Sequence, residues 1–123
     1  MKNILLVGLG GALGSILRYL VSLWTTKEAT QHFPWATFII NVSGCLAIGL
    51  LMGLLDKQIL SNATRLLLIT GFCGGFTTFS TFSAENIKLI QSGHLFTALL
   101  YIILSIILGL AAVWGGLFLT KAI

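Results

Sequence analysis

Charged residues are scarce in this sequence. Only 8% of the 123 residues are Asp, Glu, Lys or Arg, against about 25% in an ordinary soluble domain. Cysteine and proline are also rare, with two cysteines and one proline. Cys45 and Cys73 both lie in apolar segments, where a thiol behaves as a small buried hydrophobe. Their positions indicate neither a disulfide framework nor a metal-binding spacing. The low content of charged residues argues against a soluble protein.

Basic residues exceed acidic ones by seven to three, but they are scattered singly along the chain. A nucleic-acid interface would gather them in a patch, whereas single basic residues suit helix ends near lipid headgroups. We therefore expect no nucleic-acid partner.

Long apolar runs are what the sequence does have. Apolar residues make up 57% of the chain, and the mean hydropathy is +1.04. A helix needs about 20 apolar residues to cross the hydrocarbon core of a bilayer. The sequence therefore predicts an all-α membrane protein, in which residues 1–123 form a single domain of four transmembrane helices. The expected spans are Ile4 to Trp24, Trp35 to Leu55, Leu66 to Ala84 with a continuation toward Gln91, and Leu95 to Thr120.

The first span has other readings. Lys2 followed by an apolar run is typical of a signal peptide, although we expect this segment to be retained as a span. The glycines between Val7 and Gly14 are similar to a dinucleotide-binding turn, but their spacing is off by one. Glycines four residues apart instead favour close packing of membrane helices. Such pairs are Gly10 and Gly14, Gly49 and Gly53, and Gly71 and Gly75.

Basic residues usually mark the cytoplasmic side of a membrane protein, but their bias is weak here. With four spans, one side of the membrane would carry Lys2, Lys57, Arg65 and Lys121, and the other side Lys27 and Lys88. The side of Arg18 is uncertain. So small a difference permits insertion in both orientations, and four short helices enclose little of a pathway alone. We therefore expect an antiparallel homodimer with dual topology.

Residues 71–83 form a run of glycines, hydroxyl residues and phenylalanines without a charge. The pair Gly74-Gly75 weakens a helix. A helix interrupted at bilayer depth persists only where its freed backbone groups find a partner, and such interruptions usually mark ion or substrate sites. The sequence therefore predicts a third helix broken near Gly74-Gly75.

Polar residues inside the expected spans are candidates for function. Arg18 either snorkels to the membrane interface or serves an electropositive role, since a charge in hydrocarbon costs about 2.5 to 3.5 kcal/mol. Asn41 shares a helix face with Thr37; its amide either joins helices or offers two donors to an anion. Glu85 could couple protons, although a salt bridge or an interfacial position is the expected role.

Phe79 and Phe82 are neighbours on one face if the chain after the break is helical. Phenylalanine in a membrane helix normally packs, but phenyl rings also have electropositive edges. Hydroxyl donors surround these two rings, which together suit moderate binding of a small anion. On the last span, Tyr101 and Ser105 lie one turn apart and could continue the path, unless Ser105 bonds its own helix backbone. The surrounding hydroxyl residues are Thr77, Thr78, Ser80, Thr81 and Ser83.

These motifs resemble the small bacterial fluoride channels, the Fluc family, over the whole chain. The resemblance rests on Arg18-Tyr19, Asn41-Val42-Ser43-Gly44 and the segment from Gly74 to Phe82. It implies antiparallel dimers with two fluoride pores, and a structural sodium ion at the dimer centre held by backbone carbonyls at Gly74 and Thr77. It also implies that Asn41, Phe79 and Phe82 line the fluoride path, and Tyr101 and Ser105 match pore-side positions. From the residues themselves we further predict Thr37 in the path and Arg18 in an electropositive vestibule.

The resemblance implies passive export of fluoride across the bacterial inner membrane. The expected partners are fluoride, a second copy of the chain and membrane lipid, and no enzyme activity is expected. Two alternatives remain. A small proton-coupled multidrug antiporter should carry a carboxylate in its first span, which here holds Arg18 and no acid. A structural subunit packed through its glycine faces would leave the cluster of hydroxyls and phenylalanines without a purpose.

Overall fold

The computed structural model describes residues 1–26 and 32–122. All regular structure in these residues is helical, and four helical segments are long and apolar enough to cross a membrane. This confirms the predicted all-α fold with four spans. Lys27, which entered the comparison of basic residues, lies outside the described residues. The elements are α1 (Lys2–Thr26), α2 (Trp35–Asp56), α3 (Asn62–Arg65), η1 (Leu66–Cys73), α4 (Gly74–Phe76), α5 (Phe79–Gln91) and α6 (Leu95–Lys121).

The third candidate span is made of several elements in sequence. It extends over Asn62–Gln91 and joins α3, η1, α4 and α5. The side chain of Ser61 accepts a hydrogen bond from the backbone N–H of Thr64 and caps the start of α3. The helix therefore begins four residues before Leu66, where the sequence had placed the start of the span.

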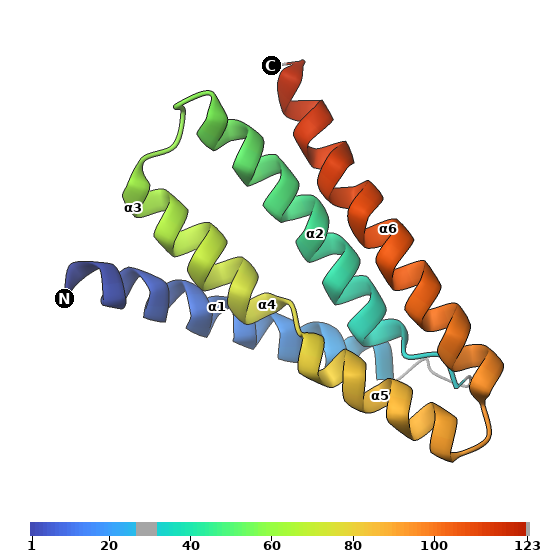
Figure 1. The fold of residues 1–123 in the computed structure, drawn as a ribbon. Coiled ribbons are helices and arrows are strands. Elements are labelled where there is room, and N and C mark those ends of the chain that lie inside the picture. The colour runs from blue at the N-terminus through green and yellow to red at the C-terminus, as the bar shows by residue number, and fades with distance from the viewer. Residues whose placement is uncertain (27–31, 123) are drawn as a thin grey trace.

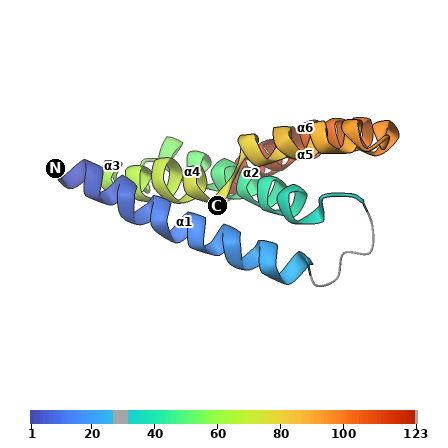
Figure 2. The same ribbon diagram turned by 90° about the horizontal axis from the view of Figure 1, so that it is seen from below.

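The helices pack as two pairs, and each pair runs in parallel. α1 lies along η1 and α4, and α2 lies along α6 (Figure 1). Seen from below, α1 follows one side of the molecule next to the segment from α3 to α4, and α5 and α6 extend toward the other end (Figure 2).

Glycines allow the close approach of α2 and α6. A Cβ atom added at Gly49 would collide with the carbonyl oxygen of Val113, and one at Gly53 would collide with the side chain of Thr120. From the other helix, a Cβ at Gly116 would lie 2.6 Å from the backbone nitrogen of Leu50. Only glycine permits backbone contacts of this kind. The predicted packing role of Gly49 and Gly53 is confirmed.

The second pair uses the same device. A Cβ atom at Gly10 would collide with the carbonyl of Leu67, and one at Gly14 with the carbonyl of Phe72. Gly75 approaches the backbone of Gly11 equally closely. The rest of α1 presents many exposed apolar side chains, as expected of a surface that faces lipid.

The backbone leaves the helical conformation at Thr77 and Thr78, not at the glycines. Gly74 is helical, with φ −63° and ψ −37°, and it lies with Gly75 inside α4. Thr77 and Thr78 are extended, with ψ values of 158° and 115°. β-Branched threonine suits extended backbone, and Thr78 caps α5 by accepting from the N–H of Thr81 at 3.2 Å. The non-helical residues therefore follow Gly74-Gly75 by two to four positions, and the glycines themselves are helical.

A small buried core fixes α5 against α6. Leu89, Ala98 and Tyr101 are its buried members, and Phe33, Phe38 and Phe82 pack against them. Tyr101 is fully buried, and its ring meets those of Phe33 and Phe82 edge to face at centroid distances of 5.3 and 4.9 Å. This packing holds the hydroxyl group of Tyr101 at a fixed place near Phe82.

Candidate functional site

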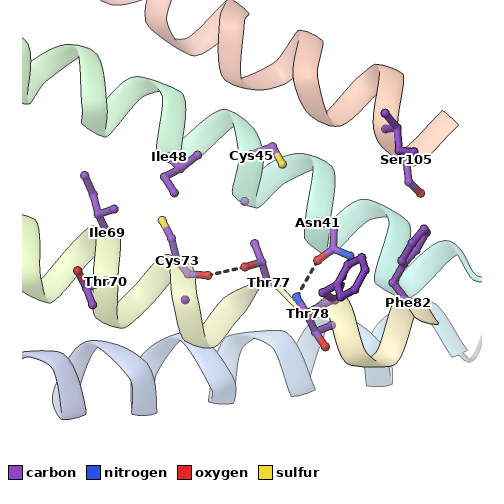
Figure 3. Close-up of a pocket in the computed structure, with 14 residues that line it drawn as sticks. Asn41, Cys45, Ile48, Ile69, Thr70, Cys73, Thr77, Thr78, Phe82 and Ser105 are labelled. Carbon is purple, nitrogen blue, oxygen red and sulfur yellow. Dashed lines mark hydrogen bonds between the residues drawn. The ribbon is translucent and has the colours of Figure 1, made fainter. Parts of the chain in front are cut away.

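Most of the predicted site residues meet at one cavity. It has a volume of about 490 Å³ and lies among α2, η1, α4, α5 and α6 (Figure 3). None of the described residues that line it carries a charge. The predicted residues in its lining are Asn41, Phe79, Phe82, Ser105, Gly74 and Thr77.

Asn41 is paired with the extended backbone after α4. Its Oδ1 accepts from the N–H of Thr78 at 2.8 Å, and its Nδ2 donates to the carbonyl of Thr78 at 3.0 Å (Figure 3). The amide thus binds both polar groups of one peptide residue. An amide NH₂ group has two hydrogens, so one donor remains beyond the bond to Thr78.

The pairing of Asn41 also changes the hydrogen bonding of α4. In a continuous helix the N–H of Thr78 would donate to the carbonyl of Gly74, but here it donates to Asn41. Thr77 ends the preceding turn, because its N–H and its hydroxyl both donate to the carbonyl of Cys73, at 3.0 and 2.8 Å. The Gly74 carbonyl is therefore released from the regular helical pattern.

The two phenylalanines that follow the extended residues differ in exposure. Phe79 is 79% exposed and Phe82 is half-buried, with ring centroids 5.8 Å apart. The hydroxyl of Thr78 donates to that of Thr81 at 3.0 Å, and it lies 3.4 Å from the hydroxyl of Ser80. Two phenyl rings and three hydroxyl groups therefore lie in the segment that begins α5.

Ser105 lies on α6 at the edge of the cavity (Figure 3). Its Oγ is buried and has no hydrogen-bond partner among the described residues. The alternative weighed above, a bond from Ser105 to its own helix backbone, is therefore absent there. A buried hydroxyl without a partner is costly, which points to a partner outside the described contacts.

Thr37 and Tyr101 meet at the carboxylate of Glu85 rather than in the cavity lining. The hydroxyl of Thr37 donates to Oε1 of Glu85 at 2.8 Å, and that of Tyr101 donates to Oε2 at 2.8 Å. Both donors are neutral, so in the described residues Glu85 has two hydroxyl bonds and no salt bridge. The other expectation for Glu85, an interfacial position, stays a prediction. Phe82 connects this trio to the cavity through its ring contact with Tyr101.

Sequence reasoning had not linked Glu85 to Thr37 and Tyr101. The three residues come from α5, α2 and α6 and are far apart in the chain. The available signal was position: Thr37 and Tyr101 lie near the starts of two parallel helices, and Glu85 lies one turn beyond Phe82 on α5. Only the crossing of these helices brings them together.

Arg18 is not brought into this arrangement. It is half-buried on α1, one turn beyond Gly14, and it is not among the residues that line the cavity. Its role in a vestibule stays a prediction.

Comparison with known proteins places this arrangement in a family. The family model described as "CrcB-like protein, Camphor Resistance (CrcB)" matches residues 5–117. The chain belongs to the CrcB family. CrcB relatives named "Fluoride-specific ion channel FluC" include one from Flavobacterium psychrophilum, 53% identical over 98% of both chains. Those of Azobacteroides pseudotrichonymphae and Rhizobium meliloti are each 48% identical, over 98% and 99% of this chain and 98% of the relative.

The resemblance drawn from the sequence motifs is therefore confirmed at the level of the family. With four candidate spans and bacterial CrcB relatives along nearly its whole length, the chain is a multi-pass protein of the bacterial inner membrane.

Proposed function

We propose that this CrcB protein is a fluoride-specific ion channel that lets fluoride leave the cytoplasm passively. The observation that carries the proposal is the uncharged cavity, which combines phenyl rings, hydroxyl groups and an amide next to an interrupted helix. The relatives are named as fluoride-specific ion channels, which agrees with this function. An ion channel is not an enzyme.

Fluoride holds its hydration water strongly, so a selective pore must replace that water with donors at close range. The cavity offers the second amide hydrogen of Asn41, the free hydroxyl of Ser105 and the edges of Phe79 and Phe82. None of these groups is a permanent cation, which would hold the anion too tightly to release it. The hydroxyls of Thr37 and Tyr101, which both donate to Glu85, continue the path beyond Phe82.

Passive export follows from the chemistry of the ion. Fluoride enters a cell from acidic surroundings as neutral HF, dissociates in the cytoplasm and leaves as the anion down its electrochemical gradient. This requires a path and no energy-coupling domain. A proton-coupled multidrug antiporter has less support, because the first span has no carboxylate, and both oxygens of Glu85, in the third span, already accept hydrogen bonds from hydroxyls.

We further propose that Thr77 and Thr78 interrupt the third span inside the membrane. Extended backbone at bilayer depth needs partners for its polar groups, and the Asn41 amide supplies them for Thr78. The interruption then places ends of α4 and α5, with their free backbone groups, beside the path.

The working unit in this proposal is an antiparallel homodimer with two pores. Phe79 is 79% exposed in a single chain, and Ser80 and Thr81 beside it are exposed hydroxyl residues. Lipid offers these hydroxyls no hydrogen bonds beyond their contacts with Thr78, whereas a second copy would cover them and complete the wall of the path. One chain alone leaves this side of the cavity open.

Dual topology predicts that both orientations occur in one membrane. A tag at the C-terminus, close to Lys121, should be reached by an impermeant label from either side of the membrane, in comparable amounts. The measurement is labelling of intact spheroplasts against inverted vesicles. If every copy is labelled from one side only, the antiparallel dimer is wrong, while channel activity would remain open to test.

We also propose that the carbonyls of Gly74 and Thr77 hold a structural sodium ion between the two copies. Gly74 is exposed and its Cβ position is open, and its carbonyl lacks the helical donor that Thr78 gives to Asn41. Carbonyl oxygens are hard ligands that suit a hard cation, and two copies would supply about four of them. The donor set therefore fits the ion, which would join the subunits without taking part in transport.

Removal of sodium should then destabilise the dimer. A ligand present at about 100 times its dissociation constant stabilises the folded state by about 2.7 kcal/mol. We expect the melting temperature of the purified dimer to fall when a bulky organic cation replaces sodium, and to recover when sodium is restored. An unchanged melting temperature after exhaustive replacement would contradict the sodium site and leave the fluoride path unaffected.

The experiment that tests the function is fluoride efflux from proteoliposomes that contain the purified protein. We expect efflux that needs neither a proton gradient nor a drug substrate. Drug and proton exchange would instead support the antiporter, and neither activity would favour a structural subunit.

A further inference from the structure

Both cysteines of the chain line the cavity. Cys45 comes from α2 and Cys73 from η1, and both are free thiols. Cys73 is 2% exposed, and its sulfur points from η1 toward α2 (Figure 3). The fluoride path proposed above uses neither thiol.

The packing of α2 against α4 brings the backbone segments that carry the two cysteines close together. A Cβ atom at Gly44 would collide with the methyl group of Thr77, so the helices touch at this point. Cys45 follows Gly44 directly, and Thr77 is bonded to the carbonyl of Cys73. Two sulfur atoms from separate helices therefore share one cavity.

We propose that Cys45 and Cys73 together form a binding site for a soft, two-coordinate metal cation such as Hg²⁺, and that filling the site blocks the path. Thiolate ligands select soft cations. The other described residues of the lining include no histidine and no carboxylate, so harder divalent ions find no comparable set of ligands there. The blocking effect rests on the proposed function, whereas the binding does not.

The charge balance favours a divalent ion. When Hg²⁺ binds, two S–H bonds break, two S–Hg bonds form, and two protons leave to solvent. The product, a bis-thiolate of Hg²⁺, has no net charge. The same two thiolates around a monovalent ion such as Ag⁺ would leave one negative charge in an apolar, poorly hydrated cavity, where an unpaired charge is costly.

The bound metal would sit between α2 and η1, in the cavity that also holds Asn41 and Phe82. An ion that fixes both sulfurs there reduces the space available to fluoride. Occupancy of the site and loss of flux should therefore rise together, reaching a full block at one metal ion per chain.

The test is a titration of the purified protein with Hg²⁺, followed by proton release, metal content and fluoride flux. We expect one Hg²⁺ and two released protons per chain, with flux lost in proportion. In Cys45→Ser and in Cys73→Ser we expect only one released proton. Cys73→Ala serves instead if a buried hydroxyl at position 73 prevents assembly. Flux is compared with the untreated sample of the same variant.

A matched control keeps the number of thiols and moves one of them. Ser43 is exposed on α2 and bonds the backbone of its own helix, so the double change Cys45→Ser with Ser43→Cys places a thiol outside the cavity. This variant should bind two Hg²⁺ ions per chain, each with one released proton.

If the parent protein also binds two Hg²⁺ ions per chain, each with one released proton, the two cysteines do not share a metal ion and the proposed site is wrong. One bound ion with undiminished flux would overturn the block. If untreated protein conducts no fluoride, the proposed function is wrong. The numbers of bound Hg²⁺ ions and released protons per chain would still test whether the two cysteines bind one metal ion.

Discussion

Replacing Asn41 by leucine is expected to reduce fluoride flux on the order of a hundredfold. A hydrogen bond to a charged group contributes about 1.5 to 3 kcal/mol, and each 1.4 kcal/mol corresponds to about a factor of ten in rate. Leucine has the same branched arrangement of heavy atoms as asparagine, but it can offer no donor to a fluoride ion that has lost its water.

The substitution also removes both partners of Thr78. The backbone N–H and carbonyl of this residue bond the Asn41 amide at 2.8 and 3.0 Å. An unpaired buried polar group costs about 1 to 3 kcal/mol, so the extended backbone at Thr77 and Thr78 would shift or recruit water. Loss of flux therefore has two causes in Asn41→Leu, a lost donor and a displaced pathway.

Asn41→Asp keeps one of the two bonds to Thr78. A carboxylate can still accept from the N–H of Thr78, but when ionised it can donate neither to the Thr78 carbonyl nor to fluoride, and it repels the anion. We expect this variant to assemble and to conduct as poorly as Asn41→Leu. Ser43→Ala on the same helix is the control, because Ser43 is exposed and bonds only its own helix backbone. Parental flux in both Asn41 variants would remove Asn41 from the path.

Replacing Phe79 or Phe82 by isoleucine should reduce flux roughly three- to tenfold for each, since specific ring interactions contribute about 0.5 to 1.5 kcal/mol beyond burial. Isoleucine keeps apolar bulk but has no electropositive ring edge. The effect at Phe82 should be the larger one, because its ring also contacts that of Tyr101, at 4.9 Å. The measurement is the initial rate of efflux at equal protein density.

Phe96 offers a matched control for Phe79. The two side chains are 80% and 79% exposed, but Phe96 lies on α6 outside the cavity lining. Phe96→Ile should leave the flux unchanged. If Phe79→Ile and Phe82→Ile conduct as well as Phe96→Ile does, the rings contribute bulk alone and the assigned pathway is wrong.

The spans and the glycine faces were predictable from sequence because both depend on local composition. An uncharged apolar run long enough to cross a bilayer is read directly from residues such as Trp35 to Leu55, and the structure places α2 there with one more residue. Glycines four residues apart lie on one helix face, and the helices approach each other at Gly49 and Gly53 as expected.

The details of the site depend on pairs of elements and could not be derived in the same way. Gly74-Gly75 was the strongest local signal for a break, yet the helix continues through both glycines. It ends where the amide of Asn41, from another helix, takes the backbone groups of Thr78. The Asn41 amide, predicted to offer two donors to an anion, therefore donates one of its hydrogens to the backbone carbonyl of Thr78.

The most direct test of the central claim is fluoride efflux from proteoliposomes loaded with potassium fluoride, followed with a fluoride electrode. On addition of a potassium ionophore, which relieves the charge left by departing anions, we predict rapid efflux that carries net charge. Vesicles loaded with potassium chloride should show no comparable chloride efflux. Fluoride release no faster than from protein-free vesicles, or release only when a proton gradient or a drug is supplied, would contradict the assignment of a fluoride channel.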